Sequence, residues 1–167
     1  LRQIMPHAGR RAETFCDPLN AAMDEFEINT PQRQAAFLAQ VAHESGELRY
    51  TREIASGAAY EGRLDLGNTE PGDGVMFPGR GLLQVTGRDA HRLCGLALGL
   101  DLLLHPELLE QPVAACRSAG WVWRDFKKLN PLADSGDFKR ITRRINGGLT
   151  HQAERVAYWR VAVDIFC

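Results

Sequence analysis

The sequence lacks several features that would assign it to a class directly. No window of about twenty consecutive apolar residues occurs, which argues against a transmembrane helix. The four cysteines are widely scattered and form no CxxC pair, so the sequence predicts no metal site, and reduced thiols are the default expectation. The formal net charge is only -1, which argues against a general affinity for nucleic acid.

What is present is the composition of an ordinary globular protein. Of the 167 residues, 44% are hydrophobic and 25% are charged, which shows neither disorder nor membrane bias. A domain near this size buries roughly 70% of its unfolded surface and therefore folds without staples. No internal repeat, low-complexity tract or linker interrupts the chain. We therefore expect one domain over residues 1–167.

Helical periodicity dominates the pattern of apolar residues. Thr30 is a typical N-cap and Pro31 suits the first helical position, so a helix is predicted from there to a stop at Gly46. Asp137 is a second predicted N-cap. Further helices are expected at residues 19–26, 89–98, about 112–127, 138–146 and near the C-terminus.

The segment between residues 55 and 87 differs from the rest of the chain. It is rich in glycine and in turn-forming residues, which predicts a loop-rich region. Leu82–Val85 is the best candidate for a strand, paired with Leu64–Leu66. The predicted fold class is therefore mainly α, with a small β- and loop-rich part.

Glu44 stands out among the carboxylates. It lies three residues after Val41 and seven after Phe37, so it shares the apolar stripe of its predicted helix. Burial and the partial negative charge of a helix C-terminus both disfavour the charged form of a carboxylate. Such a group suits a general acid. The alternative is a structural carboxylate paired with Arg49, Arg52 or another base.

Glycoside hydrolysis pairs such an acid with a second carboxylate, which acts as nucleophile or as the base that activates water. Glu47 lies beyond the glycine stop and is expected to point to solvent. Glu53 and Glu61 stand at the entrance to the loop-rich segment, where either can face Glu44 across a cleft. The other carboxylates in this region are Asp65, Glu70 and Asp73. Spacing alone does not choose among them.

Three short motifs carry a resemblance to a known family. They are Ala-His-Glu-Ser-Gly at residues 42–46, Gly-Arg-Gly-Leu-Leu-Gln-Val-Thr-Gly at 79–87 and Arg-Ile-Asn-Gly-Gly at 144–148. In this order the chain resembles glycoside hydrolase family 19 from about residue 20 to the C-terminus. It looks more like the compact lysozyme or phage endolysin branch than like the plant chitinases.

The resemblance implies a fold and a set of roles. The fold is a bilobal, lysozyme-like α+β domain with a central substrate cleft, a loop-rich small lobe at about residues 55–87, and no metal or organic cofactor. Glu44 matches the general acid, Glu53 the base and Thr86 a hydroxyl that helps to hold water, in a reaction expected to be inverting. The expected substrate-binding residues are His43, Tyr60, Glu61, Arg63, Gln84, Asn146 and Arg155.

Chemistry and resemblance together predict an enzyme that cleaves β-1,4 bonds between N-acetylated amino sugars of bacterial peptidoglycan. A chitinase is the alternative within enzymes, and a non-catalytic glycan-binding homologue is the alternative outside them. A nucleic-acid-binding role for the basic group near residue 140 is disfavoured by the overall charge. That basic group consists of Lys139, Arg140, Arg143 and Arg144.

Expectations about location and partners follow from that function. Residues 1–11 contain no apolar run after a basic start, so no secretory signal is predicted in the sequence. We expect synthesis in the cytoplasm and action in the periplasm or cell wall, reached through a holin or a dedicated secretion route. A monomer without stable membrane insertion is expected, with peptidoglycan or a chitin-like polysaccharide as its partner.

Overall fold

The structure is a computed structural model that describes all residues from 1 to 167. It confirms the mainly helical class. The α-helices are α1 (Arg11–Glu25), α2 (Pro31–Glu44), α3 (Asp73–Met76), α4 (Arg88–Leu98), α5 (Pro112–Trp121), α6 (Asn130–Asp134), α7 (Phe138–Asn146) and α8 (Gln152–Phe166). Three 3₁₀ segments, Ala58–Tyr60, Leu64–Leu66 and Pro106–Glu110, and a π-helical turn at Val122–Phe126 complete the elements.

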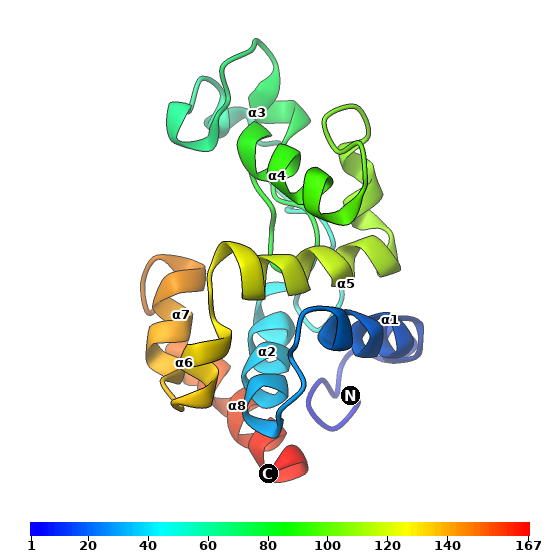
Figure 1. The fold of residues 1–167 in the computed structure, drawn as a ribbon, viewed down its shortest axis with the longest axis vertical. Coiled ribbons are helices and arrows are strands. Elements are labelled where there is room, and N and C mark those ends of the chain that lie inside the picture. The colour runs from blue at the N-terminus through cyan, green and yellow to red at the C-terminus, as the bar shows by residue number, and fades with distance from the viewer.

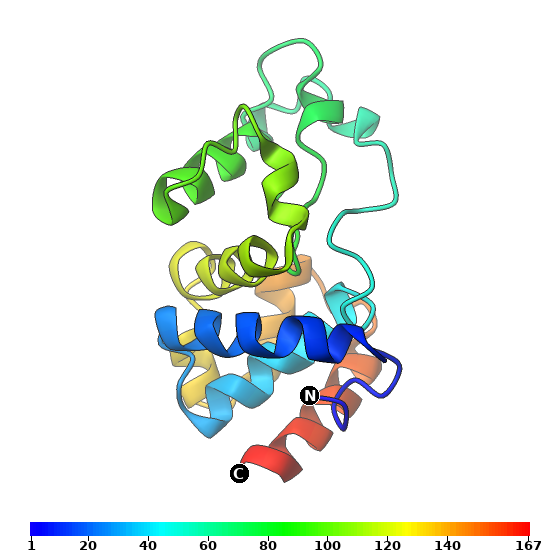
Figure 2. The same ribbon diagram turned by 90° about the vertical axis from the view of Figure 1, so that its right-hand side faces the viewer.

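The helices are divided between the two ends of the elongated molecule. One end holds α1, α2 and α6 to α8 together with both chain termini, and the other holds α3, α4 and the long loops around them (Figure 1). Helix α5 crosses between them, and in the turned view it lies between α4 and the helices of the larger end (Figure 2). None of the helices is both long and apolar enough to span a membrane.

Helix α2 lies at the centre of the larger end. Every residue from Ala35 to Ala42 is buried, so the helix is enclosed on all sides and not only along one stripe. It packs most extensively against α8, while α1 packs against α5. The acid candidate at the end of α2 is therefore held by the most enclosed helix of the fold.

Local sequence signals set the ends of the helices as expected. The Thr30 hydroxyl accepts from the Arg33 amide at 3.3 Å, and the Asp137 carboxylate accepts from the Arg140 amide at 3.0 Å. Both residues satisfy amides that have no partner inside a helix, which is the physical basis of N-capping. The predicted starts of α2 and α7 are confirmed.

The predicted strand pairing is wrong. Leu64–Leu66 forms a 3₁₀ helix, and Val85 pairs back onto Arg80, which also bridges to Arg52. Gln84 has a left-handed backbone with φ 56°, so the chain turns back on itself before a strand can extend. The β part of the predicted small lobe is reduced to these isolated bridges.

Two helical predictions also change. The first helix spans Arg11–Glu25 and not 19–26, because Pro18 is accommodated inside it and does not mark its start. The predicted helix at 112–127 continues beyond Trp121 as a π-helical turn, in which the Lys127 amide donates to the Val122 carbonyl at 2.8 Å.

Candidate active site

Glu44 is the last residue of α2, and the chain reverses directly after it. The Ser45 hydroxyl donates to the Val41 carbonyl at 2.6 Å and accepts from the Leu48 amide at 2.8 Å, which fixes this reversal. The Glu44 side chain is 20% exposed and lines the largest cleft of the molecule. The end of α2 therefore places the half-buried Glu44 carboxylate in the wall of this cleft.

Arg155 of α8 is paired with Glu44. Its Nη1 lies 2.5 Å from Glu44 Oε1, and its side chain is only 1% exposed. The Arg155 Nε also donates to the Thr150 carbonyl at 3.2 Å. This contact is a charge-assisted hydrogen bond from a buried guanidinium, and it fixes the direction of the Glu44 carboxylate.

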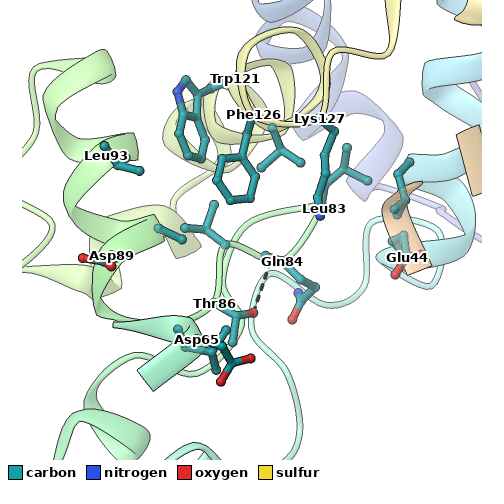
Figure 3. A pocket seen from close by; sticks show the side chains of 15 residues that line it. Glu44, Asp65, Leu83, Gln84, Thr86, Asp89, Leu93, Trp121, Phe126 and Lys127 are labelled. Carbon is teal, nitrogen blue, oxygen red and sulfur yellow. Dashed lines mark hydrogen bonds between the residues drawn. The ribbon is translucent and has the colours of Figure 1, made fainter. Parts of the chain in front are cut away.

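The cleft beside Glu44 has a volume of about 580 Å³, which falls within the range of ligand-binding sites. Figure 3 shows Glu44 and Gln84 on one side of it, with Thr86 and Asp65 further along and Trp121 and Phe126 opposite. Its lining combines apolar side chains with a small number of polar ones. The polar or charged members are Glu44, Asp65, Gln84, Thr86, Asp89 and Lys127.

The turn at residues 80–86 presents Gln84 and Thr86 to the cleft. The Gln84 Nε2 donates to the Gly81 carbonyl at 3.0 Å, and the Thr86 hydroxyl donates to the Gln84 carbonyl at 3.2 Å, as the dashed line in Figure 3 marks. These bonds fix the turn and leave the Gln84 Oε1 and a Thr86 lone pair without a hydrogen-bond partner in the protein.

Glu53 lies directly beside this turn. Its amide donates to the Gly79 carbonyl at 2.9 Å, and its Oε2 accepts from the Tyr60 hydroxyl at 3.0 Å. A Cβ on Gly79 would lie 2.2 Å from the Gln84 Oε1 and 2.9 Å from the Glu53 Oε2, so only glycine fits between these side chains. The Glu53 Oε1 is buried without a partner, and no cation pairs with this carboxylate.

Comparison with known proteins finds relatives that cover most of the chain. No family model matches the chain. A glycosyl hydrolase family 19 domain-containing protein of Haemophilus influenzae is 28% identical over an alignment of 190 positions. The alignment covers 95% of this chain and 90% of that protein. An endochitinase of Arabidopsis thaliana is 39% identical over 115 residues, or 68% of this chain.

A solved structure agrees over nearly the whole length. The crystal structure of chitinase C from Streptomyces griseus superposes with a TM-score of 0.81 at 26% identity, covering 99% of this chain and 89% of that one. The chain belongs to glycoside hydrolase family 19. The chain spans only 39% of the length of the Arabidopsis endochitinase that it matches.

The three motifs that suggested family 19 meet at the cleft. Glu44 comes from the first, residues 83–86 from the second and Ile145 from the third, although more than fifty positions separate the second motif from the third. The expected glycoside hydrolase class is therefore confirmed at the level of the family. The endolysin branch stays a prediction.

The other carboxylates considered for the second role are engaged elsewhere. Glu61 accepts from the Gly72 and Gly74 amides at 2.6 and 2.8 Å, so both its oxygens hold the loop before and within α3. Asp65 lines the cleft, but it is paired with Arg63 through two hydrogen bonds, and that hydrogen-bonded guanidinium lowers the pKa of Asp65.

The expectation that Glu47 points to solvent is wrong. Its residue exposure is 6%, and its carboxylate accepts from the His7 amide and ring and from the Tyr158 hydroxyl. The reason is that the chain turns back at Gly46, and Glu47 itself has a left-handed φ of 56°. Glu47 therefore joins the N-terminal segment to α8.

The remaining predicted substrate-binding residues are His43, Asn146, Tyr60 and Arg63, and they differ in their contacts and burial. His43 has its Nδ1 3.4 Å from the Glu154 carboxylate, and burial, with the nearby Arg155 cation second, lowers the pKa of its ring. Asn146 ends α7 exposed, next to the cleft residue Ile145. The Tyr60 hydroxyl bonds Glu53, and Arg63 bonds Asp65, so the expected contacts of Tyr60 and Arg63 with substrate stay predictions.

The apolar wall at the end of α5 was not predicted from the sequence. Trp121 and Phe126 stack with ring centroids 5.0 Å apart, and both line the cleft with Lys127. Their five-residue separation matches the π-helical turn, whereas an α-helical reading places them on different faces. Asp89 of α4 also lines the cleft.

The structure contains no group of three or more His, Cys, Asp or Glu side chains arranged to hold a metal ion. All four cysteines are free, and burial raises the pKa of both Cys94 and Cys116 to about 12. Such thiols remain protonated and are poor nucleophiles.

Proposed function

We propose that this family 19 chain hydrolyses β-1,4 bonds between N-acetylated amino sugars, with Glu44 as the general acid and Glu53 as the base. The observation that carries the proposal is the half-buried Glu44 carboxylate, which opens into the cleft beside Gln84 and Thr86. Glycosidases use two carboxylates on opposite sides of the scissile bond.

Glu44 gives its proton to the glycosidic oxygen as the bond to the departing sugar breaks. A sugar bound in the cleft displaces water from the exposed fifth of this side chain, and the loss of water favours the neutral carboxylic acid. Arg155 then stabilises the carboxylate that remains after proton transfer, because their atoms are 2.5 Å apart.

Glu53 takes a proton from the attacking water. One oxygen of its carboxylate has no hydrogen-bond partner and is free to accept from water, whereas Arg63 holds Asp65 in a bidentate pair. Thr86 has a free lone pair to accept from the same water. The water attacks from the face opposite the leaving group, which gives inversion.

Chitin-type polymers of N-acetylglucosamine are the better supported substrate. The relatives with a named activity are chitinases, whereas nothing found among them supports the initial expectation of peptidoglycan. Gln84 can both donate to and accept from the N-acetyl groups that the two polymers share. Peptidoglycan is therefore the second substrate to be tested.

The test incubates the purified chain with a chitin hexasaccharide and, separately, with peptidoglycan sacculi. Mass spectrometry identifies the new reducing end, and proton NMR of the first products identifies its anomer. We expect cleavage of the hexasaccharide with release of the α-anomer. Muropeptides without chitin products would overturn the substrate, and retention of the β-anomer would overturn the role of Glu53.

The variant Glu44→Gln decides whether the site is catalytic. We expect it to lose activity by about 10²–10⁴-fold, the usual contribution of a general acid, and to keep its affinity for the hexasaccharide. Full activity in this variant would refute the assignment. Binding without any hydrolysis in the wild-type protein would identify a glycan-binding homologue instead.

A further inference from the structure

Gln40 lies one helical turn before Glu44 on α2 and is fully buried. Its Oε1 accepts from the Arg155 Nη1 at 2.6 Å, and its Nε2 donates to the Thr142 hydroxyl oxygen at 2.9 Å. A buried amide in the middle of an apolar helix costs free energy unless its polar atoms are paired. This side chain connects α7 to α8 through α2.

Thr142 of α7 decides which way the Gln40 amide faces. The Thr142 hydroxyl donates its single proton to the Phe138 carbonyl at 3.3 Å, so toward Gln40 it can only accept. The amide nitrogen of Gln40 must therefore face α7. That orientation leaves the Oε1 toward Arg155, whereas the opposite one would set two donors against each other.

The Arg155 guanidinium donates hydrogen bonds to three acceptors, and only one of these acceptors is charged. Gln40 Oε1 and the Thr150 carbonyl are neutral, while Glu44 is the one anion bonded to the guanidinium. The same Nη1 bonds both Gln40 and Glu44, at 2.6 and 2.5 Å. A shift of the amide therefore moves the atom that holds the Glu44 carboxylate.

We propose that Gln40, oriented by Thr142, is a positioning residue that holds the Arg155 Nη1 against Glu44 and thereby fixes the carboxylate for proton transfer. This inference rests on the proposed function, in which Glu44 is the acid. Gln40 is not among the residues that line the cleft, so we expect its side chain to act through Arg155. Misplacement of a reacting group by about 1 Å can cost on the order of 10²-fold in rate.

The first test is the variant Gln40→Met, which keeps the length of the side chain but has no polar atom. We expect kcat on the chitin hexasaccharide to fall by about 10-fold or more with little change in KM, because substrate contacts remain. Thr142→Val removes the acceptor for the Gln40 amide and should lower kcat in the same direction. Thr142→Ser keeps the hydroxyl, so its kcat should equal that of the wild type.

The variant Gln40→Glu tests the pH profile of kcat, which would not change if Gln40 had only a structural role. It retains an acceptor for Arg155 but adds a second anion, so the charge of Arg155 is shared and Glu44 keeps its proton to higher pH. The alkaline limb of the kcat profile should therefore move to higher pH. The other charged or titratable groups around Glu44 are His43, Asp65, Asp89, Lys127, His151 and Glu154.

The outcomes separate this inference from the proposed function. Thermal unfolding of each variant gives the folded fraction, so kcat is expressed per folded molecule. If Glu44→Gln inactivates the enzyme while folded Gln40→Met and Thr142→Val keep the wild-type kcat and pH profile, the positioning role is refuted. If Glu44→Gln stays active, the proposed function fails. If Gln40→Met does not fold, the comparison of kcat between Thr142→Val and Thr142→Ser tests the positioning role.

Discussion

The Tyr60 hydroxyl donates a hydrogen bond to the Glu53 carboxylate at 3.0 Å and is its one side-chain partner. Tyr60 ends the 3₁₀ turn Ala58–Tyr60, and its carbonyl accepts from the buried Asn68 side chain at 2.8 Å. Asn68 in turn accepts from the Arg88 amide at the start of α4. The loop-rich end of the molecule thus holds the proposed base from one side.

Tyr60→Phe should slow hydrolysis without unfolding the protein. The change removes the hydroxyl and leaves the ring, so the Glu53 carboxylate loses the bond that fixes its direction. We expect kcat on the chitin hexasaccharide to fall by about 10-fold, because a general base must be aligned with its proton. Steady-state kinetics and thermal unfolding, measured on the same sample, check the prediction.

Tyr158→Phe is the matched control, because Tyr158 donates to the buried Glu47 carboxylate at 2.9 Å, a structural pair in this protein. Loss of that bond should cost about 1.5–3 kcal/mol of stability and leave kcat per folded molecule unchanged. A lower kcat in Tyr158→Phe, or an unchanged one in Tyr60→Phe, would contradict the distinction between the two pairs.

Replacing each glutamate by glutamine distinguishes Glu53 from Glu61 as the base. Glu53→Gln should lower kcat by about 10²–10⁴-fold, since the amide cannot take a proton from water. Glu61→Gln keeps one oxygen acceptor for the Gly72 or Gly74 amide, so we expect most of the activity to remain. The reverse order of the two activities would exchange their roles.

The buried pair between Asp73 and Arg88 should stabilise the loop-rich end. Asp73 is 2% exposed and accepts two bonds from Arg88, at 2.6 and 2.8 Å. The Arg88 guanidinium left behind is 30% exposed and can be hydrated, so Asp73→Asn should cost about 1.5–3 kcal/mol at pH 7, as for lost hydrogen bonds to a charged group. Urea unfolding measures this, and Asp65→Asn in the exposed Arg63 pair should leave stability unchanged.

The same pair has a defined pH dependence. The bonds from Arg88 lower the pKa of Asp73 below its ordinary value of 3.8. Its stabilising contribution is therefore complete above that value and is lost as the pH falls through the lower folded pKa. The stability difference between wild type and Asp73→Asn should shrink below pH 3.8, and a difference that grows there would contradict the ion pair.

His91 should make the protein sensitive to mild acid. Its ring is fully buried beside Phe77, and burial lowers its pKa from 6.5 to about 4, even though its Nδ1 is bonded to the Gly87 carbonyl. The unfolded chain binds this proton below pH 6.5 and the folded one does not until about pH 4. Stability therefore falls by up to about 3 kcal/mol over this range as the pH decreases.

The variant His91→Phe removes that titrating group. Its stability should depend less on pH than that of the wild type between pH 6.5 and 4, as measured by urea unfolding at several pH values. His105→Ala removes an exposed histidine and serves as the control for the loss of an imidazole from the surface. Equal slopes for all three proteins would show that His91 does not titrate differently on folding.

Some features of this protein followed from local sequence. Thr30 and Pro31 set the start of α2, Asp137 set the start of α7, and apolar spacing placed Glu44 on an enclosed helix that ends there. Capping and periodicity depend on residues a few positions apart, so they can be read without knowledge of the fold. The three family motifs identified the proton donor candidate for the same reason.

Only tertiary structure decided what surrounds that residue. Arg155 meets Glu44 across 111 positions, Gln40 meets Thr142 across 102, and the end of α5 supplies the apolar wall of the cleft. Glu47 is buried and Glu61 is engaged with backbone amides, because turns with left-handed residues redirected them. Such contacts depend on how separate helices pack together, and the spacing of residues within one helix carries no information about that packing.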